Sequence, residues 1–487
     1  MLKYCESNGI FDSFSQIHSL AYSIVALQEA YLYTTYNPLY WITSVLTNNS
    51  GSTLDVDYEE FEEDSKEDRE DKEQEVELKK QQTLYDKMAR ALGDVRSHGY
   101  VVSPPYVNEA EYDFFPNTKE NYIVFSLKAI VGLSDATAFK IVQERKIAKF
   151  TSLQDFIQRV TPSNKELYAL VKAGALDEFE EDRIKLMKQV VTEIVGLKET
   201  LNGQNIPFIA NNNLYPSELQ RDIDLKLWQK QFGKKNLVAG TKNMFYVQDC
   251  ELTQEILLEL EEDKDYMYLD KGIAVNKTKA EKVVLSKTSK LQEWLKSSDA
   301  LHQFNRYRLN EEWKENCIGD ISHWSFEALC YYPEEHELDK VDLSQYYISD
   351  FNELSPIPIQ VAETKRGKIT YPIYKLDRIC GTVVAKNNTK HIVTLFTTTG
   401  IVDVKFNKGQ YSYYNKQLSE IQKDGTKKVI EKSWFKRGNL LMIVGYRREN
   451  MFYPKVYSNS IYQHSVQKIN KITKDNKLIL QNDRVEE

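Results

Sequence analysis

Cysteine is scarce in this chain, and long apolar runs are absent. Five cysteines lie far apart among 487 residues, and no Cys-x-x-Cys pair occurs, so the sequence indicates neither a disulfide framework nor a zinc knuckle. No stretch approaches the roughly 20 consecutive apolar residues that span a bilayer, and the first ten residues lack the basic and apolar segments of a secretory signal. These absences favour a cytoplasmic protein with no membrane partner.

Histidine is equally sparse. The seven histidines are scattered, and none has a partner four residues away that would form a metal site on a helix. We therefore expect no metal cofactor in this chain. The length corresponds to about three domains of ordinary size.

The net charge of -8 hides two opposite regions. Between Asp55 and Glu77 there are 14 acidic and three basic residues, a local charge of -11. Between Lys365 and Lys455 there are 19 basic and six acidic residues, a local charge of +13. A basic region of this kind indicates a polyanionic partner.

Hydrophobic periodicity divides the chain. Apolar residues at helical spacing from Ser19 to Thr47, broken at Asn37-Pro38, predict two helices. The acidic run that follows has too little apolar content to form a core, so we expect a disordered or loosely helical insert. Residues 214–345 read as mainly helical. From Lys375 the period changes to two, and four or five β-branched strands within about 90 residues suggest a small barrel.

Lysines and aromatic residues alternate in the predicted barrel. Single-stranded nucleic acid needs cations for its phosphates and flat rings on which its bases stack, each stack being worth roughly 1–3 kcal/mol. The alternative is that Phe396 and Phe406 face the barrel core while the lysines only aid solubility. The candidate DNA-contacting residues of this region are Lys386, Lys390, Phe396, Lys405, Phe406, Lys408, Tyr411 and Tyr413.

Two glycine turns fit helix-hairpin-helix units. Such a unit needs a glycine where the backbone turns, and it directs the free N–H groups of the next helix at a phosphate. Gly132 meets this requirement, and Lys128 or Lys140 adds charge. A second turn contains Lys172 and Gly174. The alternative is that both glycines serve purely structural turns.

The same residues resemble a known family. The segment Phe14-Ser15-Gln16-Ile17-His18-Ser19-Leu20-Ala21-Tyr22 is similar to the fingers region of the bacterial DNA polymerase III alpha subunit. Val102-Ser103-Pro104-Pro105-Tyr106-Val107-Asn108 is similar to a later crossing in that family, and residues 125–134 and 150–177 resemble its tandem helix-hairpin-helix region. Residues 327–338 look like the segment before its oligonucleotide-binding barrel. These similarities follow the order of the family.

Departures from the family are also present. Ser134 stands where the first hairpin has its second glycine, although a serine can still cap the helix and leave an N–H outward. The palm aspartates that hold two metal ions in the family lie upstream of the fingers, and this chain begins at the fingers. Asp222-Ile223-Asp224-Leu225 copies the palm signature superficially. It follows the hairpins, however, and it continues into a predicted helix, which argues against a catalytic role.

The resemblance implies a multidomain α+β protein, largely helical over its first two-thirds with helix-hairpin-helix elements, followed by a small antiparallel β-barrel of the OB-fold. It implies that His18 faces the incoming nucleotide. The expected segments are a fingers remnant (1–50), an acidic insert (51–82), a fingers continuation (83–125), tandem hairpins (126–200), a helical connector (201–364), the OB-fold (365–460) and a tail (461–487).

The expected function is the C-terminal portion of a split polymerase III-like alpha subunit that binds template-primer and single-stranded DNA. A second polypeptide would carry the palm aspartates and Mg²⁺, and this chain would be inactive alone. A sliding clamp is a further candidate partner, although Gln229-Lys230-Gln231-Phe232 is too degenerate for a clamp motif. The alternatives are a non-catalytic single-stranded-DNA-binding accessory protein and a fragment of a longer product.

Overall fold

The computed structural model describes residues 16–50, 87–366, 369–421, 427–456, 465–482 and 484. The chain divides into two compact units, one formed by Met1–Leu186 with Gly319–Glu487 and the other by Met187–Ile318. The expected acidic insert at 51–82 lies outside the described residues.

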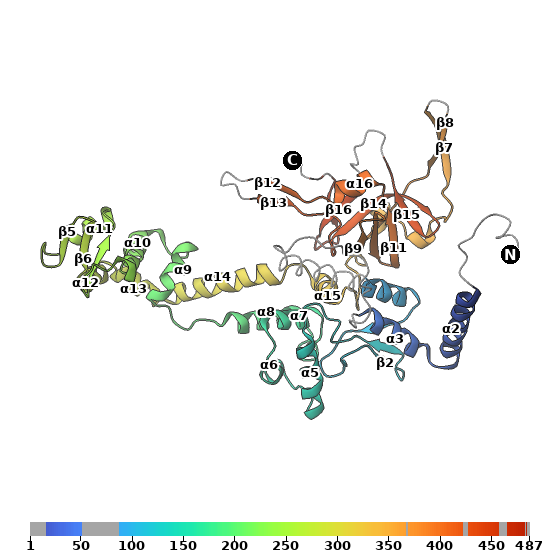
Figure 1. The fold of residues 1–487 in the computed structure, drawn as a ribbon, viewed down its shortest axis with the longest axis horizontal. Helices are drawn as coiled ribbons and strands as arrows, with labels where there is room; N and C mark the ends of the chain where they lie inside the picture. The colour runs from blue at the N-terminus through green and yellow to red at the C-terminus, as the bar shows by residue number, and fades with distance from the viewer. Residues whose placement is uncertain are drawn as a thin grey trace. The chain divides into compact units, whose positions relative to one another are not determined.

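The first unit begins with the two helices that the sequence predicts, α2 (Gln16–Thr35) and α3 (Pro38–Asn49) (Figure 1). The break lies at Asn37, whose side chain accepts a hydrogen bond from the Leu39 N–H at 3.0 Å. Pro38 occupies the first turn of α3, where a missing N–H costs nothing. A further helix covers residues 87–97.

A small sheet and four short helices follow. The sheet has the order β1-β3-β2, with β1 parallel to β3. Three of the helices have serine N-caps, namely Ser134, Ser152 and Ser163, and Ser163 forms a capping box with Glu166 at the start of α7. The fourth follows Asp182, whose carboxylate accepts from the Ile184 N–H. The elements are β1 (Val102–Ser103), β2 (Phe115–Asn117), β3 (Tyr122–Val124), α5 (Asp135–Ile147), α6 (Leu153–Val160), α7 (Asn164–Lys172) and α8 (Arg183–Val195).

Five strands of the C-terminal region close into a barrel. Their order is β9-β10-β11-β15-β14, and β14 also pairs with β9. Neighbouring strands run antiparallel except β11 and β15, which run parallel and complete the ring. Burial alternates along β11, as expected when one face covers a core. The elements are β9 (Asp377–Asn387), β10 (Ile392–Thr397), β11 (Gly400–Lys405), α16 (Lys408–Asn415), β14 (Leu440–Arg448) and β15 (Met451–Pro454).

Aromatic side chains fill the barrel. Tyr414 stacks on Trp434 with ring centroids 5.2 Å apart, and Phe406 packs on Phe435 at 4.9 Å. Strands β16 and β17 extend the sheet beyond β14, and two hairpins are attached. These elements and the segments before the barrel are α15 (Ile321–Leu329), η5 (Leu343–Tyr346), η6 (Phe351–Glu353), β7 (Gln360–Arg366), β8 (Ile369–Tyr374), β12 (Leu418–Ile421), β13 (Lys427–Glu431), β16 (Val466–Ile472) and β17 (Leu478–Gln481).

The second unit combines helices with a three-stranded antiparallel sheet of order β4-β6-β5. The sequence predicted mainly helix here, because strands of four or five residues are too short for their alternation to stand out. The elements are η1 (Gly203–Asn205), α9 (Ile206–Asn211), η2 (Ser217–Leu219), α10 (Gln220–Trp228), η3 (Gln229–Gln231), η4 (Lys234–Asn236), β4 (Met244–Val247), α11 (Glu251–Leu257), β5 (Tyr266–Leu269), β6 (Gly272–Asn276), α12 (Lys277–Lys287), α13 (Ser289–Leu295) and α14 (Ser298–Asn316).

The expected fold class is confirmed: the protein is of the mixed α+β type, with a closed five-stranded barrel consistent with the OB-fold. Among the helices in the described ranges, none combines the length and the apolar character that crossing a bilayer requires.

Candidate nucleic-acid interface

The first hairpin has the predicted turn and helix cap. Gly132 has a φ of +90°, a conformation that glycine adopts without steric cost. Ser134 is the N-cap of α5, and its Oγ accepts a hydrogen bond from the Thr137 N–H at 3.3 Å. Lys128 is half-buried, with Nζ 5.4 Å from the centroid of the Tyr112 ring. The positive φ of Gly132 and the Ser134 cap therefore account for the turn and for the start of α5.

An internal carboxylate occupies the start of α5. Glu166 Oε1 accepts hydrogen bonds from the Ser134 N–H at 3.2 Å and from the Ser134 hydroxyl at 2.6 Å. Burial alone would raise the pKa of Glu166, but hydrogen bonds from Ser134, Ser163 and Thr137 outweigh it and lower the pKa to about 2. The structure thus differs from the expectation of an outward Ser134 N–H, because Glu166 reaches it from α7.

We expect Glu166→Gln to destabilise the first unit by about 2 kcal/mol at neutral pH, because the variant loses charge-assisted hydrogen bonds. The folded-state pKa lies below the ordinary value of 4.5, so the ionised carboxylate contributes its full stability above pH 4.5 and loses it as the pH falls towards 2. Urea unfolding from neutral to acidic pH measures this difference. It should shrink with acidification, whereas the exposed control Glu120→Gln should change little. A pH-independent loss would contradict the ionised role of Glu166.

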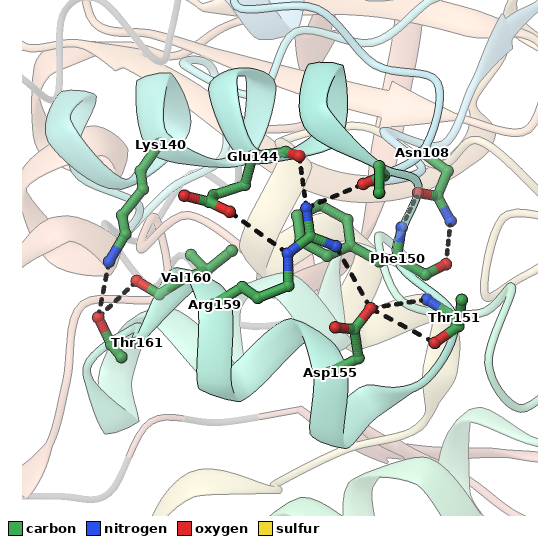
Figure 2. A network of polar contacts seen from close by, with 10 residues as sticks. Asn108, Lys140, Glu144, Phe150, Thr151, Asp155, Arg159, Val160 and Thr161 are labelled. Atoms are coloured by element: carbon green, nitrogen blue, oxygen red, sulfur yellow. Dashed lines mark hydrogen bonds and ion pairs between the residues drawn. The ribbon is translucent and has the colours of Figure 1, made fainter.

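Arg159 joins α5 to α6 (Figure 2). Its guanidinium donates to the carboxylates of Glu144 and Asp155, at 3.3 Å in each case, and lies 4.4 Å from the centroid of the Phe150 ring. Lys140 Nζ donates to Thr161 Oγ1 at 2.9 Å at the end of α6. Lys140 remains partly exposed, so the structure leaves it near the surface of the hairpin region.

The second hairpin is built around a buried arginine. Gly174 has a φ of +72°, and a Cβ at this position would collide with the Arg183 guanidinium. Lys172 Nζ pairs with Glu327 Oε2 at 2.9 Å, and the lysine side chain is only 12% exposed. The two predicted DNA-contacting residues of this turn, Lys172 and Gly174, thus make internal contacts. This agrees with the alternative in which the glycine serves a purely structural turn.

Arg183 was missed by sequence reasoning. Its side chain is 3% exposed, and it donates to Asp177 Oδ2 at 3.0 Å, Ser325 Oγ at 2.8 Å and Glu334 Oε1 at 3.0 Å. Burial raises the pKa of Asp177, and the neighbouring arginine opposes that rise. Arg183 thus fastens the hairpin to α15 and to the segment after it.

The predicted barrel lysines gather around the β9–β10 turn. Lys405 Nζ donates to the Lys390 carbonyl, which joins β11 to this turn. Lys386 Nζ donates to Asn415 Oδ1 at 2.8 Å, at the end of α16. Lys408 is exposed at the start of α16, three residues beyond the end of β11. This set of Lys386, Lys390, Lys405 and Lys408 is called the lysine cluster below.

The predicted aromatic residues do not accompany these lysines on the surface. Phe396, Phe406 and Tyr411 are exposed by 0%, 2% and 3%, because their rings fill apolar contacts inside the unit. Tyr413 is half-buried, with the Arg484 guanidinium 6.0 Å from its ring centroid. Phe406 packs in the barrel core, as the alternative expected, whereas Phe396 points out of the barrel and is buried against Tyr332 and His336. A buried ring has no face for a base.

The outer surface of β10 and β11 is covered by the helix at residues 87–97. Arg90 Nη2 pairs with Asp403 Oδ1 at 3.0 Å. Gly93 faces Ile401 so closely that a Cβ would collide with it. The second and third strands of OB-folds supply their common oligonucleotide-binding face. In this chain the helix at 87–97 packs on that face of β10 and β11.

The fingers candidate, His18, and the palm-like aspartates, Asp222 and Asp224, lie on different helices. His18 lies in α2, two residues after its beginning, and its side chain lies outside the described part of the chain. Asp222 and Asp224 lie on α10, where Asp222 Oδ2 accepts a hydrogen bond from the Leu291 N–H at 3.2 Å. Over the residues that the structure describes, no group of three or more His, Cys, Asp or Glu could hold a metal ion.

Comparisons with known proteins agree with the two hairpins. Residues 99–186 match the family described as helix-hairpin-helix motif. The fold therefore joins a helix-hairpin-helix region to an OB-type barrel in one chain.

The relatives are DNA polymerases. Over 481 residues the chain is 34% identical to the probable DNA polymerase YorL of Bacillus subtilis, covering 97% of this chain and 35% of that protein. A DNA-directed DNA polymerase of Bacillus phage SPbeta gives the same values. The DNA polymerase III subunit alpha of Helicobacter pylori is 31% identical over 174 residues, 34% of this chain and 12% of that protein. The chain is thus homologous to DNA polymerases, and it spans about a third of the length of the first two relatives.

Proposed function

We propose that this chain is the C-terminal, DNA-binding portion of a split DNA polymerase III-like alpha subunit. A second polypeptide carries the palm aspartates, which hold the Mg²⁺ ions for phosphoryl transfer to the primer. The observation that carries the proposal is the homology of 97% of the chain to about a third of a probable DNA polymerase. The proposal includes the segments expected from the sequence, from the fingers remnant to the tail. It also includes a nucleotide-binding role for His18.

The exposed surface of α2 supports a protein partner. Leu20, Leu27 and Tyr31 are exposed by 63%, 71% and 64%. The 20-residue helix contains no Lys or Arg, and its acidic and histidine residues are Glu29 and His18 alone. A helix that is mainly apolar on all sides is normally buried. The proposed occupant is the palm-bearing polypeptide.

The lysine cluster supports DNA binding by the barrel. Lys390 and Lys408 are exposed, and Lys405 lies between them on β11. On a single strand, each phosphate that a lysine neutralises releases about 0.7 counterion. In the hairpin region, Lys128 and Lys140 are both half-buried and keep part of their side chains in solvent.

Single-stranded DNA binding by the full chain is expected to weaken steeply with salt. Replacing Lys390, Lys405 and Lys408 by alanine should reduce the slope of log K against log salt by about 2, because three contacts contribute roughly 0.7 each. Fluorescence anisotropy with an oligodeoxythymidine between about 50 and 200 mM salt measures the slope.

The matched control replaces three exposed lysines of the second unit, Lys282, Lys290 and Lys296, by alanine. It lowers the net charge equally and should leave the slope nearly unchanged. Equal slopes for both triple variants would contradict a DNA contact at the lysine cluster. A wild-type chain that binds no DNA would overturn the proposed function itself.

A further inference from the structure

Three tyrosines form a row on the outside of the barrel, on β8, β14 and β15. Tyr446 on β14 is paired across the strands with Tyr453 on β15, and their rings are stacked with centroids 5.8 Å apart. Tyr374 at the end of β8 packs against Tyr446, with centroids 4.8 Å apart. Each of the three side chains is half-buried and keeps part of its surface in solvent. Tyr374, Tyr446 and Tyr453 are called the tyrosine row.

A cation and a hollow lie beside this row. The exposed Arg448 places its guanidinium 5.7 Å from the centroid of the Tyr453 ring. A hollow of about 270 Å³ opens beside Tyr446, and its lining includes Leu354, Ile357 and Arg447. Flat rings, a cation and an apolar recess are the groups that bind unstacked bases and the phosphates between them.

The tyrosine row continues towards the lysine cluster. Strands β11 and β15 run parallel, with Val404 opposite Phe452, and both of these side chains point into the core. Lys405 and Tyr453 each follow by one residue, so both side chains point outward on neighbouring strands. The register thus places Lys405 on β11 beside Tyr453 on β15, which is followed by Tyr446 on β14 and Tyr374 at the end of β8.

The local charges favour a polyanion at this surface. Lys375 Nζ pairs with Asp377 Oδ1 at 3.1 Å, so one of the two acidic side chains that line the hollow has a cationic partner. Glu353 also lines the hollow, and Arg447 on its rim donates to the carbonyls of Phe351 and Leu354. Arg448 and Lys405 remain as the cations next to the rings.

We propose that single-stranded DNA crosses the barrel along the tyrosine row, with bases stacked on Tyr453 and Tyr446 and phosphates paired with Arg448 and Lys405. This inference rests on the proposed function, because it assumes that the chain binds DNA. It assigns the stacking surface to β14 and β15, the fourth and fifth strands of the barrel, with Lys405 at the end of the third strand supplying a cation. The helix at 87–97 covers Ile401 and Asp403 on the third strand, so that part of the strand is not free to bind DNA.

The test compares substitutions that separate stacking from packing. In the full chain, Tyr453→Ala and Tyr446→Ala should each weaken binding of an oligodeoxythymidine by about five-fold or more, since a stacked base is worth roughly 1–3 kcal/mol. Tyr453→Phe keeps a ring and should bind like the wild type. Tyr453→Leu keeps an apolar side chain without a ring and should bind as weakly as the alanine variant. Fluorescence anisotropy gives the affinities, and thermal unfolding shows whether each variant is folded.

Controls separate this inference from the function on which it rests. Tyr268→Ala removes an exposed strand tyrosine of the second unit and should leave binding unchanged. Binding of a blunt duplex should be equal in all variants, because paired bases offer no face to the rings. Wild-type affinity in the leucine variant, or an equal loss for duplex and single strand, would overturn the tyrosine row as a stacking surface. Failure of the wild-type chain to bind any DNA would instead overturn the proposed function.

Discussion

The purified chain should extend no primer, and a polypeptide that carries the palm aspartates should restore synthesis when the two are mixed. Two-metal phosphoryl transfer requires carboxylates aimed at one pair of ions. Asp222 and Asp224 cannot serve this role as placed, because they lie on helix α10, where Asp222 accepts a hydrogen bond from Leu291 and Asp224 from Gln220 at 3.0 Å. We expect no primer extension by either polypeptide alone and full extension by the mixture. Primer extension with Mg²⁺ and nucleotides measures it.

A variant of α2 makes the experiment specific. Leu27→Glu places a charge on the surface proposed to meet the palm, and it should prevent both association and synthesis in the mixture. The matched control is Leu258→Glu, at a leucine of the second unit that is 87% exposed. Robust synthesis by the isolated chain, abolished by Asp222→Ala, would refute the split arrangement. DNA binding without any restored synthesis would favour the non-catalytic accessory protein.

Arg183→Met should destabilise the second hairpin by about 3–5 kcal/mol, because it leaves the carboxyl group of Asp177 buried without its partner. The side chain of Arg183 is 3% exposed and that of Asp177 is 17% exposed, so water cannot replace the lost contacts fully. Hydrogen exchange of the amides in α7, α8 and α15 measures the change locally, which matters in a chain of two units that need not unfold together.

Two further variants calibrate this result. Lys185→Ala removes a cation that is 61% exposed and pairs with Glu180, and it should leave the protection of these amides nearly unchanged, because water screens an exposed ion pair. Gly174→Ala should lower protection in the same amides as Arg183→Met, because its Cβ displaces the same guanidinium. Unchanged protection in Arg183→Met would show that the three contacts of Arg183 do not hold the hairpin.

Sequence reasoning was accurate where local chemistry decides the structure. The break at Asn37-Pro38, the turn at Gly132 and the alternating pattern of β11 follow from backbone sterics and from side-chain period, which act within a few residues. The Ser163-x-x-Glu166 pattern, which was not among the features predicted above, is typical of the capping box that the structure contains. It gives no indication that the same glutamate caps α5 through Ser134, which lies 32 residues away from it along the chain.

The sequence by itself determined that this protein joins hairpin turns to a basic β-barrel, because periodicity, glycine positions and charge are local or additive properties. Only the tertiary structure decided which surfaces of the barrel are exposed to solvent and which are covered by other elements. It placed the ring of Phe406 in the barrel core and buried that of Phe396 on the outer side of β10. It also packed the helix at 87–97 over β11 through Arg90 and Asp403, and brought Tyr374 into contact with Tyr446. Such contacts join residues up to about 300 positions apart. They depend on how whole elements pack, and no pattern within a segment records that.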